Sequence, residues 1–120
     1  MKGIAATTAL LAFLTGCAVR YQPLHDHVGY CAEVLDHQHA RVEFHGRAPV
    51  SYEKLEQLLR RYAQELCPGQ GVPTRIVRDE FIVTTWDGLG SRPPDIRGVS
   101  AEIACPRPAG EVLARCAVFR

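Results

Sequence analysis

The chain has 120 residues, a formal net charge of +1 and 47% hydrophobic residues, a size and composition that fit one modest globular domain. Lys and Arg together number 14 against 13 Asp and Glu, and they form no basic run along the sequence. A nucleic-acid-binding stripe or a basic contact with a membrane surface would require such a cluster, so we expect neither.

The first element is an apolar run from Ile4 to Leu14, preceded by Lys2. It is far shorter than the ~20 residues that a membrane-spanning helix requires, so we interpret it as the core of a signal peptide. The sequence LTGC that ends at Cys17 resembles the lipobox of bacterial lipoproteins. This resemblance implies cleavage before Cys17 and lipidation of its thiol and new amine. An ordinary secretory signal with an incidental cysteine is the alternative.

Three regions follow from this interpretation. Residues 1–16 are the cleaved signal peptide, residues 17–29 a lipidated N-terminus with a short tether, and residues 30–120 a single domain. Two or more acyl chains anchor a protein stably, whereas one does not. Ala18, in place of an aspartate, implies sorting to the outer membrane within the lipoprotein pattern. We therefore expect the domain on the periplasmic face of that membrane.

The clearest element of the domain is an amphipathic helix over residues 51–66. Ser51 suits the N-cap and Glu53 the first turn, while Pro68 and Gly69 end the helix. The apolar side chains recur with the period of one helical face: Leu55, Leu58, Leu59, Tyr62, Ala63 and Leu66. We expect this stripe to cover the domain's own core.

Strand patterns lie on both sides of the helix. Residues 39–46 alternate apolar and polar side chains before it, and residues 75–86, 97–105 and 111–119 are rich in β-branched or alternating apolar residues after it. The predicted fold is α+β, with one helix packed on a small, mostly antiparallel sheet in the order β-α-β-β-β. The stretch from Trp86 to Arg97 is predicted to be an exposed loop.

Four cysteines remain besides Cys17, an even number in an oxidising compartment, so two disulfides are expected. A helix of about 16 residues rises ~24 Å, so a helix that runs back over the first strand would end near the start of that strand. That placement favours pairing Cys31 with Cys67, and it leaves Cys105 to pair with Cys116. Three connectivities are compatible with the sequence.

A family resemblance covers about half of the mature chain. It consists of Val42, Phe44 and Gly46, then Ala63, Glu65 and Leu66 in the helix, and Gly71, Phe81 and Val83 after it. This succession is similar to a family of small bacterial lipoproteins first labelled from Caulobacter sequences. The resemblance implies a lipoprotein with no assigned activity. A looser similarity, in plan only, is to the outer-membrane sensor lipoprotein of the Rcs envelope-stress system.

The histidines suggest a second possible function. All five lie in the first half of the chain: His25, His27, His37, His39 and His45. On an extended strand His37, His39 and His45 share one face, and imidazoles at i and i+2 can begin a Zn(II) or Cu(II) site. The plainer interpretation is a polar, solvent-facing strand, in which Arg41 would repel a cation.

No catalytic constellation is apparent, because the chain has no G-x-S-x-G elbow and no phosphate-cradling loop. We expect no enzyme, no cofactor and no small-molecule substrate. Apolar residues on both faces of two predicted strands favour a protein contact instead, with Trp86, Leu89 and Leu113 as candidates. The alternative is that a segment containing Val28, Tyr30, Val34 and Leu35 folds back and covers the second face. The predicted function is a lipid-anchored envelope lipoprotein that acts through protein contact, with Zn or Cu binding as the alternative.

Overall fold

The structure, a computed structural model, describes residues 19–82 and 95–116. Four strands and one α-helix form the domain, together with a short 3-10 helix. In chain order they are β1 (Gly29–Val34), β2 (His39–Arg47), α2 (Tyr52–Leu66), β3 (Val77–Phe81), β4 (Ile96–Ala104) and the 3-10 helix η1 (Gly110–Val112).

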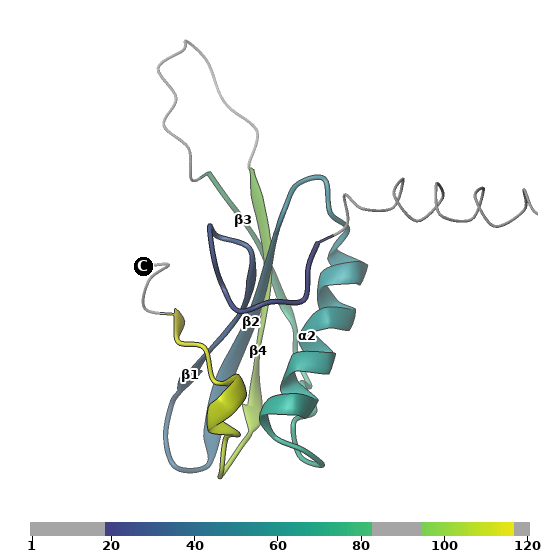
Figure 1. The fold of residues 1–120 in the computed structure, drawn as a ribbon. Helices are drawn as coiled ribbons and strands as arrows, with labels where there is room; N and C mark the ends of the chain where they lie inside the picture. The colour runs from purple at the N-terminus through teal and green to yellow at the C-terminus, as the bar shows by residue number, and fades with distance from the viewer. Residues whose placement is uncertain (1–18, 83–94, 117–120) are drawn as a thin grey trace, which may run out of the picture.

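The strands form one antiparallel sheet in the order β1-β2-β4-β3, and α2 lies against one of its faces (Figure 1). The predicted α+β class, with one helix on an antiparallel sheet and two disulfides, is therefore confirmed. The order of elements is β-β-α-β-β and not the predicted β-α-β-β-β. The order differs at two places, because a short apolar run in the sequence does not distinguish a strand from other extended chain. The chain before β2 is a strand, and residues 110–116 are a 3-10 turn with one isolated bridge.

Helix α2 forms where its sequence predicts it. Ser51 is the N-cap, and its side chain accepts a hydrogen bond of 3.1 Å from the backbone N–H of Lys54. The helix ends at Cys67, and the chain then turns back so closely that a Cβ on Gly71 would collide with the carbonyl oxygen of Ala63. The predicted apolar stripe is buried in full: Leu55, Leu58, Leu59, Tyr62, Ala63 and Leu66.

The core lies between α2 and the sheet. Alternate residues of β2 face the helix, with Ala40, Val42 and Phe44 buried there. Tyr30 of β1 stacks on Tyr62 of α2, with ring centroids 4.1 Å apart. Tyr30 was expected to help cover the opposite face of the sheet, but it belongs to the core. The reason is that β1 pairs with β2 and places Tyr30 beside Phe44. Within the described residues, no helix has the length and apolar character needed to cross a membrane.

The segment before β1 packs against the domain, which corrects the expected tether. Val19 lies over Gly46, where its Cγ2 is 3.1 Å from the position that a Cβ would occupy. The ring of Tyr21 lies against that of Tyr30 at a centroid distance of 4.9 Å, and Cζ of Arg61 lies over the Tyr21 ring, 3.8 Å from its centroid. The folded unit therefore includes residues 19–29, because aromatic packing offsets the loss of chain freedom there.

The disulfides are Cys31–Cys116 and Cys67–Cys105, so the predicted pairing is wrong. The prediction placed Cys31 in a lead-in to the first strand, whereas it lies within β1, opposite Glu43. The end of α2 instead approaches the end of β4, since Ala104 pairs with His39 at the start of β2. This brings Cys67 and Cys105 together, with Cα atoms 5.6 Å apart.

Candidate functional site

The sheet face opposite α2 carries a row of polar side chains. On β2 these are His39, Arg41, Glu43, His45 and Arg47, which alternate with the core residues. The shared face of His39, Arg41, Glu43 and His45 confirms the period predicted from the sequence. A solvent-facing strand surface is the plainest expectation for such a row, but its middle is buried.

We call Glu33, Arg41, Glu43 and His45 the charged row. Arg41 donates to Glu33 at 2.5 Å from Nη2 and to Glu43 at 3.4 Å from Nε. The other oxygen of Glu43 lies 2.9 Å from Nε2 of His45. The side chains of Glu43 and His45 are only 8% and 3% exposed. Because a buried carboxylate needs such partners, the charged row is a fixed structural element and not a set of mobile surface charges.

Gly98 of β4 makes room for the His45 ring. The two residues are paired across the strands, and a Cβ on Gly98 would lie 2.6 Å from Nδ1 of His45. The imidazole extends over the glycine toward Phe81 of β3, whose ring centroid lies 5.6 Å from that of His45. The glycine therefore permits a buried histidine at this position.

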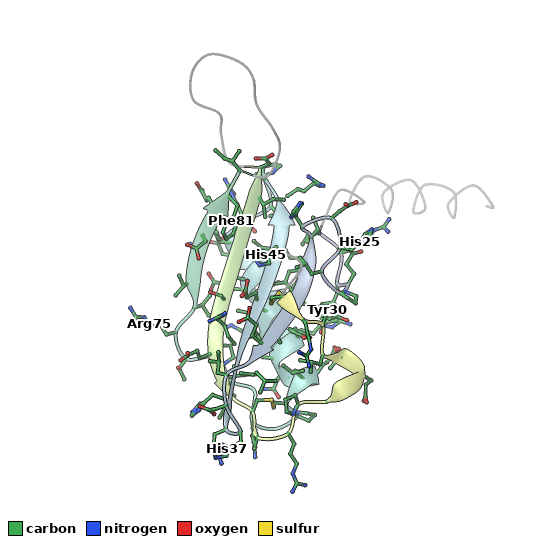
Figure 2. The ribbon with its side chains drawn as sticks, turned by 90° about the vertical axis from the view of Figure 1, so that its left-hand side faces the viewer. His25, Tyr30, His37, His45, Arg75 and Phe81 are labelled. Atoms are coloured by element: carbon green, nitrogen blue, oxygen red, sulfur yellow. A yellow bond between two sulfur atoms is a disulfide. The ribbon has the colours of Figure 1, made fainter. Side chains whose placement is uncertain are left out.

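The predicted metal site of His37, His39 and His45 is not formed. Figure 2 places His37 at one end of the sheet and His45 well along the strand toward the other. Among residues 19–82 and 95–116 one group has the proximity that a metal site needs, and it consists of Cys31, Glu43 and Cys116. The two sulfurs of that group are joined as a disulfide.

His39 is engaged locally instead. Its Nδ1 lies 3.1 Å from a carboxylate oxygen of Asp36, in the turn between β1 and β2. That carboxylate also accepts the backbone N–H groups of Gln38 and His39. These hydrogen bonds, that from Gln38 first, lower the pKa of Asp36. The arrangement is typical of a turn cap.

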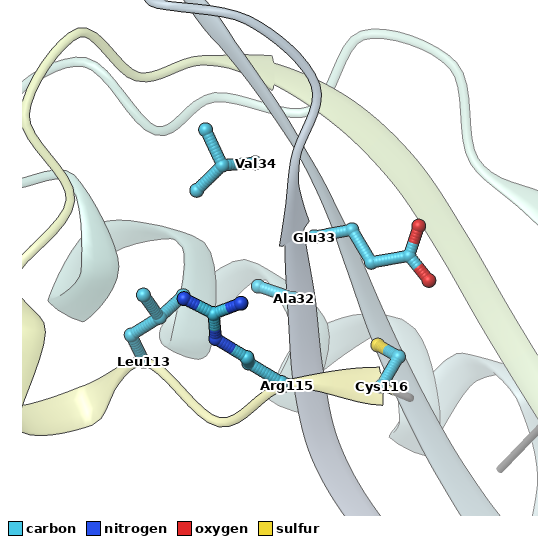
Figure 3. A pocket seen from close by; sticks show the side chains of 6 residues that line it. All are labelled: Ala32, Glu33, Val34, Leu113, Arg115 and Cys116. Atoms are coloured by element: carbon cyan, nitrogen blue, oxygen red, sulfur yellow. The ribbon is translucent and has the colours of Figure 1, made fainter. Parts of the chain in front are cut away.

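The two edges of the sheet differ. The outward-facing backbone of β1 is covered at two places by other parts of the chain. The Tyr30 N–H donates to the Gln22 carbonyl at 2.8 Å, and the Ala32 N–H donates to the Ala114 carbonyl at 2.6 Å. Figure 3 shows the second segment alongside β1, with Arg115 next to Ala32 and Cys116 beyond it. The edge of β1 is therefore closed to a further strand over these residues.

Leu113 belongs to this covering segment. It is half-buried and packs against the core, and it also lines a small cleft of about 260 Å³ with Val34 and Glu33 (Figure 3). Its packing fits the internal interpretation better than a free contact surface. Trp86 and Leu89, the other two predicted contact residues, lie outside the described residues.

The opposite edge, β3, pairs with β4 alone within the described part of the chain. The Cys105 N–H donates to the Gln38 carbonyl, so odd-numbered β4 residues bond to β2 and even-numbered ones to β3. In the observed register, Arg78 and Glu80 then turn their backbone N–H and C=O groups outward. This leaves a short row of peptide groups facing solvent.

Exposed apolar side chains accompany this free edge. Val77 is 47% exposed within β3 and Ile82 is 54% exposed directly after it. Sequence reasoning did not identify the edge, because pairing order follows from the topology. The run Arg78-Asp79-Glu80 was its one signal, since charges are a common feature of edge strands.

Comparisons with protein-family models, with curated proteins and with solved structures found no match.

Proposed function

We propose that the chain is a lipid-anchored lipoprotein on the periplasmic face of the outer membrane, and that its domain acts by protein–protein contact through the outer edge of β3. The lipobox ending at Cys17 supports the anchor, and the two disulfides fit an oxidising compartment. The role is one of binding, with no catalytic step, cofactor or small-molecule substrate.

The difference between the two sheet edges carries this proposal. The edge of β1 is covered by residues 22–24 and 114–115, whereas β3 presents outward-facing peptide groups beside exposed Val77 and Ile82. An extended segment of a partner can add to such an edge, with main-chain hydrogen bonds giving affinity and neighbouring side chains giving specificity. Arg78, Asp79 and Glu80 give this edge the charged side chains that are common on exposed edge strands.

Of the three predicted contact residues, the structure describes Leu113 alone. Trp86 and Leu89 follow β3 in the chain, so we retain them as candidates for this surface. Leu113 lies beside β1, at the opposite edge of the sheet, and is not part of it.

Two variants at one position test the edge. Glu80→Pro removes an outward-facing N–H, whereas Glu80→Ala keeps it and removes only the carboxylate. With a photo-reactive residue at position 82, we expect cross-links to an envelope protein in cells to persist in Glu80→Ala. In Glu80→Pro we expect these cross-links to fall by about tenfold or more. A tenfold weaker affinity corresponds to a loss of ~1.4 kcal/mol of binding free energy.

Controls separate binding from folding and from anchoring. The two variants should unfold at similar denaturant concentrations, since no sheet hydrogen bond uses the Glu80 N–H. Equal cross-linking in both would contradict edge addition. The intact mass of the cellular protein reports the anchor separately: a chain that begins at Cys17 with added acyl mass supports it, and a chain that begins at Met1 contradicts it.

A further inference from the structure

The surface around Val19 is the part of the domain that lies nearest to a lipid attached at Cys17. Two peptide units separate these residues, so their Cα atoms are at most ~7 Å apart even in extended chain. Val19 itself is fixed in the structure, because its side chain packs among Gly46, Val50 and Leu55. If Cys17 is lipidated, no free tether follows Val19, and this end of the domain is held close to the membrane surface.

The fold assembles cations at the same place. A depression of about 530 Å³ is lined by Val19, Pro49 and Val50 together with Arg47 and Lys54. The side chains of Arg47 and Lys54 are exposed, as is that of Arg20 beside Val19. Within the described part of the chain, none of these three forms a salt bridge with a carboxylate.

Two carboxylates near these cations have contacts of their own. Glu53, next to Lys54, has an oxygen 3.9 Å from Arg78 of β3. Asp26, whose backbone carbonyl accepts from Arg47, has its carboxylate 3.9 Å from His25. The three cations are therefore available to an external anion. The sequence predicted no basic membrane contact because these residues come from three separate segments.

We propose that this surface, which we call the basic rim (Arg20, Arg47 and Lys54 around Val19), rests on the membrane and binds the phosphate groups of anionic lipids. The proposal depends on the lipid anchor at Cys17. Each cation near an anionic bilayer surface contributes about 1 kcal/mol, so three add materially to an anchored domain's orientation. The orientation keeps the opposite end of the sheet away from the bilayer, where Figure 2 places His37 and where the chain leaves β4 after Ala104 toward Arg107.

Lys54 gives a direct measurement, because it is the single lysine after Lys2. If the Cys17 amine is acylated, Lys54 is the only reactive amine of the mature chain. We would place the lipidated protein in vesicles of phosphatidylcholine with and without about one third phosphatidylglycerol, which carry no amines of their own. The rate at which a water-soluble acetylating reagent modifies Lys54, followed by intact mass, reports its contact with headgroups.

We expect acetylation about fivefold or more slower on the anionic vesicles, as ~1 kcal/mol predicts for a single contact. High salt should restore the rate, since screening shortens the range of the attraction. Arg47→Glu should also restore it, whereas Arg107→Glu, with the same change of charge at the far end, should not.

A relocated amine is the matched control. In Lys54→Arg/Arg107→Lys the net charge is unchanged, and the amine stands beyond the β4 end that pairs with His39. Its rate should be equal on both kinds of vesicle. Equal rates for Lys54 on both vesicles, or equal slowing at both positions, would overturn the proposal. More than one acetyl group, or loss from the vesicles, would show instead that the anchor itself is absent.

Discussion

Cys31 and Cys116 are joined across 85 positions of sequence, with Cα atoms 5.0 Å apart. The bond holds the segment around Ala114 against β1, where the Ala114 carbonyl accepts the outward-facing N–H of Ala32. One disulfide therefore closes an edge of the sheet as well as linking two distant parts of the chain. The Cys67–Cys105 disulfide has a different effect, because it joins the end of α2 to the end of β4.

Removing either disulfide should destabilise the domain to a similar extent. On the loop-entropy estimate, a closed loop of 85 residues contributes about 4.5 kcal/mol and one of 38 residues about 4 kcal/mol. We expect Cys31→Ala/Cys116→Ala and Cys67→Ala/Cys105→Ala to lower the free energy of unfolding by amounts within about 1 kcal/mol of each other. Denaturant titration of both double variants measures this.

The two variants should differ in self-association. Without Cys31–Cys116 the backbone of β1 around Ala32 becomes available to a second molecule, whereas loss of Cys67–Cys105 leaves that part of the edge covered. We expect concentration-dependent dimers, measured by sedimentation in the absence of denaturant, in the first variant only. Dimers in both variants, or in neither, would contradict the role given to the C-terminal segment.

Gly98→Ala tests the space that β4 provides for the buried imidazole. The added methyl would lie 2.6 Å from Nδ1 of His45 and 3.1 Å from the Phe81 ring. We expect a loss of about 1–3 kcal/mol of unfolding free energy, the usual result of overpacking. The change should be much smaller in a His45→Ala background, because the colliding ring is then absent. Additive losses would mean that the glycine is needed for another reason.

The helix and the face of β2 could be predicted from the sequence because both depend on local periodicity. Local periodicity can be recognised without knowing which elements pack together, as in the apolar stripe from Leu55 to Leu66 and the alternation of Arg41 with Val42. The pairing of the cysteines could not be predicted, since the strand that contains Cys31 begins with a glycine and has a short apolar run instead of a clear alternation. The free edge of β3 and the grouping of Arg47 with Lys54 depend on tertiary topology alone.

Glu43→Ala should be costly because it interrupts the charged row at its most buried carboxylate. The variant leaves His45 and Arg41 without their shared acceptor in a site where Glu43 is only 8% exposed. We expect a loss of about 3 kcal/mol in unfolding free energy, near the lower limit for breaking a buried pair. Glu102→Ala is the control: this exposed carboxylate lies opposite Arg41 on β4, and its removal should change stability by less than about 0.5 kcal/mol. Equal effects at both positions would show that the row is solvated.

Tyr62 should make the domain sensitive to alkaline pH. Burial raises its pKa from 10.0 to about 12, and its hydroxyl donates to the Val112 carbonyl at 2.9 Å. A folded-state pKa above the unfolded value means that this contribution to stability is complete below about pH 10 and is lost as the pH rises toward about 12. Tyr62→Phe should cost about 1 kcal/mol at neutral pH, because the hydrogen bond is lost.

The same variant should lose less stability than the parent between about pH 10 and about pH 12, since one buried phenol no longer ionises on unfolding. Some alkaline sensitivity should remain, because burial, and then the neighbouring Glu65, raise the pKa of Tyr21 as well. Urea titrations of Tyr62→Phe and the parent at neutral and alkaline pH, with the disulfides intact, measure both effects. Parallel declines of the two proteins above about pH 10 would show that Tyr62 ionises as readily in the folded domain as in the unfolded chain.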